Sequence, residues 1–191
     1  MEPERLRAVI VSAQAGDSGA FRELLDTYGR RLYGYFLRAT GSHHDAEDLL
    51  GEVMLRLVSR LDKYDDRGRF EPWLFRIAAN MVRDRIRRMK SNLNSVSLSA
   101  ESDSGQSLAE QLSGDDPAVD GEMLAAEASQ EVGAALQKLD VMTREMILLR
   151  YFGEMSFKEL ADIFGRPLGT VLARVHRGLR TLRQYMGGES K

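Results

Sequence analysis

The sequence predicts an all-α protein, built as two small helical domains joined by a flexible acidic linker. Apolar residues recur at spacings of three and four through most of the 191 residues, and no stretch alternates as a half-buried strand would. Between the two helical parts, residues 91–130 carry eight acidic side chains and no basic or aromatic one. We therefore place domains at residues 1–90 and 131–186, with the linker at 91–130.

The first domain is expected to hold three long helices. Ser18 to Thr40 gathers apolar residues near one face, and Gly41 is a typical helix stop. Ser42 then caps a helix that runs to about Leu61. After a polar turn, a third helix starts around Pro72. The apolar positions expected to face the core in the second of these helices are Ala46, Leu49, Leu50, Val53, Met54, Leu57, Val58 and Leu61.

The second domain opens with two amphipathic segments, Val132 to Leu139 and Met146 to Phe152, and Gly153 ends the second of them. The residues that follow have the punctuation of a helix-turn-helix. A Ser-x-x-Glu capping box begins at Ser156, and a glycine and a proline at positions 165 and 167 stop one helix and restart the next.

Charges are sorted along the chain, although the net charge is only −2. Arg67 to Lys90 holds eight basic and two acidic residues, and Gly165 to Gly187 holds five arginines and no acid. A positive field of this kind attracts a phosphate backbone, so nucleic acid explains both basic regions. The alternative is that these blocks are solvated faces.

Composition excludes several other classes of function. The chain has no cysteine, which removes disulfides, thiol catalysis and cysteine-based zinc sites. The early apolar run from Ala8 to Val11 is too short for a signal sequence or a membrane span. We expect a cytoplasmic protein without membrane insertion.

The second helix of the helix-turn-helix is the candidate DNA reader. Apolar residues between Val171 and Leu182 repeat at four and three and are expected to face the core. The other faces then carry the side chains that a groove-entering helix presents. An alternative is a basic amphipathic helix that binds a protein or stays solvated. The candidate duplex-reading residues are Arg166, Thr170, Arg174, Arg177 and Arg180.

The third helix of the first domain combines basic residues with aromatic ones, as single-stranded nucleic acid requires. The amide of Asn80, set among apolar residues, could read the edge of a base. The alternative for the aromatic rings is the hydrophobic core. The candidate residues are Tyr64, Phe70, Trp73, Arg76, Asn80, Arg83 and Arg87.

Acidic residues gather at the start of the second helix, where the helix dipole alone could account for them. Two other interpretations are open. One is a mixed apolar and acidic face for protein docking. The other is a metal-dependent helical phosphohydrolase built on Asp45, Asp48 and Glu52, which would need ligands from further helices.

With these residues in view, the chain resembles the extracytoplasmic-function group of bacterial sigma factors. Asp45 to Val53 and Phe70 to Asn80 are similar to that group's second conserved region. Leu136 to Arg150, with Ser156 to Leu182, resembles its fourth. The resemblance implies transcription initiation without catalysis or a cofactor.

The resemblance also implies partners. The Asp45 to Arg56 helix would dock on the β′ clamp helices of core RNA polymerase, and the β flap would be a second contact. Asn80 and the Lys63 to Phe70 loop would help capture an unpaired base of the −10 element, and the Arg166 to Arg183 helix would read the −35 element in the major groove. An anti-sigma factor is a further expected partner. The residues expected to bind polymerase are Asp45, Asp48, Leu49, Glu52 and Arg56.

A stand-alone helix-turn-helix regulator is the rival from another class, but it has no need of a strand-capture site in the first domain. The chain departs from the family pattern at three places. Gly51 stands where glutamine is usual, Asp140 replaces a usual proline, and Leu172-Ala173 stands where a polar pair is common. The last of these puts one expected phosphate contact in doubt.

Overall fold

The computed structural model describes residues 1–65, 68–95 and 130–187. Every regular element in these ranges is helical, which confirms the predicted fold class. Most of the acidic linker lies outside the described residues, and the predicted domain boundaries stay predictions.

Four helices and one short turn build the first domain. The Asp17 carboxylate accepts from the Gly19 amide and caps the start of α2 (Ser18–Thr40). The Ser42 hydroxyl accepts from the Asp45 amide and caps α3 (His43–Arg60). Between these helices Gly41 is left-handed and ends α2, as expected. The elements are α1 (Pro3–Gln14), α2 (Ser18–Thr40), α3 (His43–Arg60), the 3-10 turn η1 (Leu61–Lys63) and α4 (Phe70–Ser95).

Helix α4 begins two residues before the predicted start at Pro72. The carbonyl of Arg69 accepts from the amide of Trp73 at 3.1 Å, so Pro72 lies within the first turn. A proline is tolerated there because the first amides of a helix have no partner inside it.

The second domain consists of a helical segment over residues 130–137 followed by α6 (Val141–Phe152), α7 (Phe157–Phe164) and α8 (Leu168–Tyr185). Helix α6 starts at Val141, five residues before the apolar segment that begins at Met146, because the Asp140 side chain caps it. The predicted helix-turn-helix is confirmed in detail. Both bonds of the capping box form, and Gly165 is left-handed with φ 58°.

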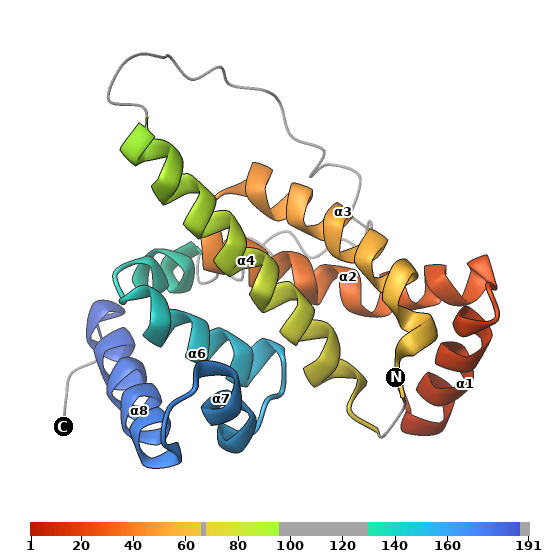
Figure 1. The fold of residues 1–191 in the computed structure, drawn as a ribbon. Helices are drawn as coiled ribbons and strands as arrows, with labels where there is room; N and C mark the ends of the chain where they lie inside the picture. Colours follow the sequence, from red (N-terminus) through yellow and green to blue (C-terminus); the bar gives the residue numbers. More distant parts are fainter. Residues whose placement is uncertain (66–67, 96–129, 188–191) are drawn as a thin grey trace, which may run out of the picture.

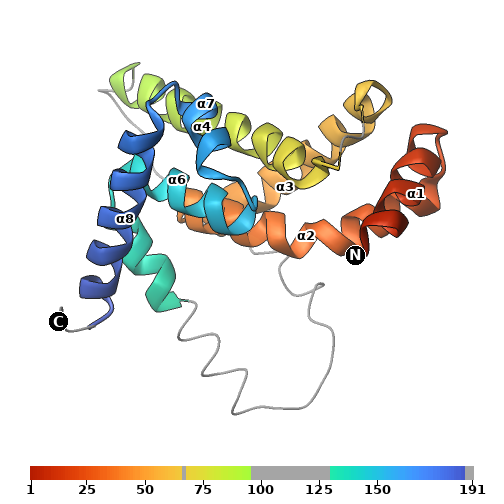
Figure 2. The ribbon, with the colours of Figure 1, turned by 90° about the horizontal axis from the view of Figure 1, so that it is seen from below.

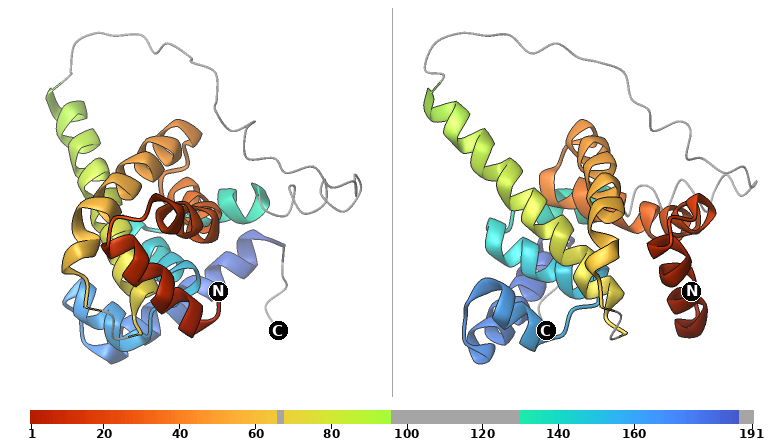
Figure 3. Two further views of the ribbon diagram at one scale, coloured as in Figure 1. Left: turned by 90° about the vertical axis from the view of Figure 1, so that its right-hand side faces the viewer. Right: turned by 45° about the vertical axis from the view of Figure 1, so that its right-hand side comes forward.

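The two helical groups pack on each other. Figure 1 shows α4 crossing in front of α2. Helices α6, α7 and α8 lie below these two at the left of the view, and α1 lies at the right-hand end of α2. The view from below in Figure 2 and the side views in Figure 3 agree with this arrangement. Helix α6 lies against α2 and α4, so one hydrophobic cluster runs through both groups, and residues of α2, α4 and α6 meet in it.

Polar contacts join the same two groups. The Arg31 guanidinium of α2 donates from Nε to the carbonyl of Phe152 at 2.6 Å, and it pairs with Glu154 at 2.9 Å. The Gln137 side chain donates to the carbonyl of Arg38 at 2.9 Å. These contacts link positions about 100 residues or more apart in the sequence. The helical periodicity of the sequence could not predict them.

Candidate nucleic-acid interface

A basic groove lies between α3 and α4, and we call it the strand groove. Its volume is about 380 Å³. Because four arginines and a single aspartate line it, the groove is positively charged. The lining residues are Arg56, Arg60, Ile77, Asn80, Arg83, Asp84 and Arg87.

The strand groove brings together three of the residues that the sequence predicted for strand capture. Asn80 is exposed, and its Oδ1 accepts from the Arg83 guanidinium at 3.4 Å. Arg87 pairs with its neighbour Asp84 at 3.1 Å. The predicted aromatic rings are not among the residues that line this groove.

Two of the lining arginines come from α3 and were not predicted for this role. Arg56 was assigned to polymerase docking, and Arg60 was not singled out. They are four residues apart, so they share one face of α3. That spacing was visible in the sequence, but only the packing of α3 on α4 turns this face toward Asn80.

The predicted aromatic residues form a packed cluster. Tyr64 is 9% exposed and Phe70 only 1%, and their ring centroids lie 5.5 Å apart. The ring of Trp73 lies 4.6 Å from that of Tyr64 and keeps part of its surface open. The prediction that Phe70 presents its ring to a base was wrong, because the ring is buried in the hydrophobic core.

Trp73 and Arg76 face the second domain. A cavity of about 200 Å³ separates them from α7, whose Glu159 and Asp162 line the opposite wall. Arg69, at the same place, forms an ion pair with Glu159. Carboxylates of the second domain therefore lie beside basic residues of the first.

Arg83 makes the most buried of these contacts. Its Nε lies 2.7 Å from Glu145 of α6, and its guanidinium stacks over the Phe164 ring at 4.7 Å. Glu145 is only 7% exposed. Burial raises the pKa of this carboxyl above its usual value, and the charge of Arg83 offsets only part of that effect.

Helix α3 presents an outer face that we call the docking face. The side chains of Asp48 and Glu52 are 42% and 45% exposed. Beside them Leu55 and Val58 are 73% and 55% exposed. Val58 was predicted to face the core, so that prediction was wrong. Two exposed apolar residues next to two acids make a surface suited to a protein partner.

Three residues predicted for docking are not on this face, and one of them, Arg56, lines the strand groove instead. Leu49 is 2% exposed and belongs to the core, and Asp45 is 8% exposed. The Arg85 guanidinium bonds to Asp45 and to Asp48, so these carboxylates form an ion-pair cluster. In the part of the chain that the structure describes, no three acidic or histidine side chains gather as a metal site would require.

Residues 166–180, which include most of α8, carry a surface that we call the recognition face. Val171 and Val175 are 0% and 1% exposed, so the predicted core-facing stripe is confirmed there. The polar candidates on the other side of the helix are open to solvent, and no acidic residue lies between positions 165 and 187. The exposed candidates are Arg166, Thr170, Arg177 and Arg180.

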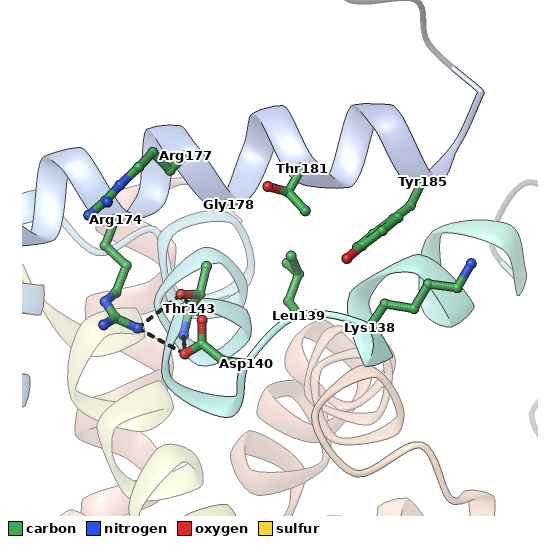
Figure 4. A pocket seen from close by; sticks show the side chains of 9 residues that line it. All are labelled: Lys138, Leu139, Asp140, Thr143, Arg174, Arg177, Gly178, Thr181 and Tyr185. Atoms are coloured by element: carbon green, nitrogen blue, oxygen red, sulfur yellow. Dashed lines mark hydrogen bonds and ion pairs between the residues drawn. The ribbon is translucent and has the colours of Figure 1, made fainter.

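Arg174, the remaining candidate, is held by α6. Its Nη1 donates to Oδ1 of Asp140 at 2.8 Å and to the Thr143 hydroxyl at 3.2 Å (Figure 4). Burial alone would raise the pKa of Asp140, but the hydrogen bonds from Thr143 and the charge of Arg174 lower it below its usual value. Asp140 is therefore ionised at neutral pH.

Known families and relatives match both parts of this arrangement. Sigma-70 region 2 matches residues 24–92, and Sigma-70 region 4 matches residues 129–182. The ECF RNA polymerase sigma factor SigW of Bacillus subtilis is 31% identical over 177 residues, covering 93% of this chain and 94% of SigW. The chain belongs to the ECF sigma factors. It directs promoter-specific transcription initiation, as its family does, and the region 2 match accounts for a first domain that a stand-alone regulator lacks.

A further relative and two solved structures are also similar to this chain. SigE of Mycolicibacterium smegmatis is 30% identical over 92% of this chain and 66% of its own length. CnrH, solved with the cytosolic domain of CnrY, has a TM-score of 0.62 and 24% identity over 96% of this chain and 98% of CnrH. RpoE of Bartonella quintana, solved with the anti-sigma factor NepR, has a TM-score of 0.65 and 22% identity over 89% and 98%. Both structures share the fold.

Proposed function

We propose that this ECF sigma factor holds the unpaired −10 strand in the strand groove. Four arginines supply the positive charge that follows a phosphate backbone, and Asn80 offers an amide to a base edge. Trp73 is partly exposed and lies two turns before Asn80 on α4, so we propose its ring as a stacking surface for the same strand. Tyr64 and Phe70 support that ring from below rather than contacting the strand themselves.

The recognition face is proposed to read the −35 element in the major groove. Thr170 lies in the first turn of α8 and Arg166 just before it, at the end where helices of this motif meet base edges. Arg177 and Arg180 follow further along the same helix. The absence of acid between positions 165 and 187 supports this assignment, since a carboxylate here would repel phosphate.

The docking face is proposed to bind core RNA polymerase. Its exposed acids and exposed apolar residues give it both charge and contact area. Because CnrH and RpoE were solved with CnrY and the anti-sigma factor NepR, we propose an anti-sigma partner for this chain as well. The chain would act in the cytoplasm as a binding protein, not as an enzyme.

The basic strand groove with an exposed Asn80 is the observation that carries this proposal. Permanganate footprinting of promoter DNA opened by the full chain with core polymerase tests it. The Asn80→Ala variant should lose reactivity of −10 thymines while still binding polymerase. The Arg30→Ala variant, changed at an exposed arginine outside the groove, should open the promoter as the wild type does.

Full −10 reactivity in the Asn80→Ala complex would remove the strand groove from the proposal. Loss of polymerase binding in that variant would show that α3 and α4 had been disturbed together.

A further inference from the structure

Asp140 connects the start of α6 with the recognition helix. Its carboxylate accepts from the Thr143 amide at 3.0 Å and from the Thr143 hydroxyl at 2.6 Å, which caps α6. The same carboxylate accepts from Nη1 of Arg174 in α8 at 2.8 Å. Figure 4 shows the three side chains meeting at one edge of a pocket of about 340 Å³. One ionised group thus fixes a helix start and an arginine of the DNA reader.

A close approach of the two helices places Arg174 there. Gly178 lies one turn further along α8, and a Cβ added to it would come within 2.3 Å of Cγ2 of Thr143. Only glycine allows the helices to be this near. The short distance puts the Arg174 side chain within reach of Asp140.

The guanidinium of Arg174 is only partly used by these contacts. Both of its hydrogen bonds leave from Nη1, and within the described residues Nε and Nη2 donate to no group. The side chain is 35% exposed, so solvent reaches it. Nε and Nη2 form an edge with two parallel donors, which is the geometry that matches O6 and N7 of guanine.

We propose that Asp140 is a positioning residue for −35 reading, and that it holds Arg174 so that the free Nε and Nη2 edge bonds a guanine of the duplex. The inference rests on the proposed role of the recognition face. An arginine that only met phosphate would gain little from a fixed orientation, because phosphate contacts carry no sequence information. A base-reading arginine gains selectivity, since the orientation is set before binding.

The test starts from the full chain bound to core polymerase, with a random duplex library used to select the preferred −35 sequence. Binding is then measured for duplexes changed at one base pair at a time. Asp140→Asn keeps a good capping residue and removes the charge. It should lose about tenfold discrimination at one G·C pair, with the slope of affinity against salt unchanged.

Arg174→Ala should lose discrimination at the same base pair, and the double variant should lose no more than Arg174→Ala alone. The matched control is Asp17→Asn. Asp17 caps α2 through the Gly19 amide, so the same chemical change there should leave every base preference intact.

Three results would overturn the inference. Asp140→Asn could leave discrimination unchanged, or weaken binding equally at every base pair as a purely structural cap would. It could also bind more tightly with a steeper salt slope, which would mean that Asp140 keeps Arg174 away from phosphate. A wild-type chain that selects no −35 sequence would instead refute the proposed function itself.

Discussion

The contact between Gly178 and Thr143 gives the sharpest stability prediction. In Gly178→Ala the new Cβ would lie 2.3 Å from Cγ2 of Thr143 and 2.9 Å from Cδ1 of Ile147. Overpacking of this kind costs about 1–3 kcal/mol, whereas alanine in place of glycine gains about 1 kcal/mol of helix propensity. These figures leave a net loss of about 0–2 kcal/mol, and we expect about 1–2 kcal/mol because Thr143 cannot rotate away without losing its hydroxyl bond to Asp140.

Thr143→Ser provides the second half of the test. Serine removes Cγ2 but keeps the hydroxyl that bonds Asp140. The double variant should therefore be more stable than the sum of the two single changes by about 1 kcal/mol. Urea unfolding of the four proteins measures this coupling. A Gly178→Ala protein that is more stable than the wild type, or additive free energies of unfolding, would refute the described approach of α8 to α6.

Three further predictions test other parts of the molecule. Glu145→Gln removes a carboxyl group whose pKa is raised in the folded protein. The wild type should lose unfolding free energy relative to this variant as pH rises above the ordinary value of 4.5, and parallel stability curves measured by urea unfolding would contradict it. The pair Asp48→Ala and Glu52→Ala should weaken binding to core polymerase, measured by fluorescence anisotropy, without changing the affinity for a −35 duplex; equal losses would mean general unfolding. Arg60→Ala should lower the salt slope for a single-stranded −10 oligonucleotide by about 0.7, and an unchanged slope would exclude Arg60 from the strand groove.

Local signals in the sequence predicted much of the fold. The capping box at Ser156 and the left-handed Gly165 mark the helix-turn-helix by rules that involve neighbouring residues only. The same logic failed at Asp140. An aspartate can cap a helix, but Asp140 has no Glu or Gln three residues later and so does not form a capping-box pattern. For this reason the start of α6 was predicted too late in the sequence.

The candidate site was harder to predict because it depends on how helices pack. Helical period placed Val58 toward the core, yet the structure leaves it on the docking face. Asp45 was predicted to contact a protein partner, but its carboxylate accepts a hydrogen bond from Arg85, which is 40 residues away in the sequence. The contact between Arg83 and Glu145 joins the two domains. The exposure of Val58 and these two ion pairs depend on how two helices lie relative to each other. The spacing of residues along one helix does not give that information.

The most direct test of the central claim is run-off transcription with the purified full chain, core RNA polymerase and a genomic promoter library. Specific transcripts that depend on the chain should appear, and their promoters should share −10 and −35 elements at a fixed separation. A chain that binds duplex DNA selectively, yet neither associates with core polymerase nor supports any specific transcript, would contradict that claim.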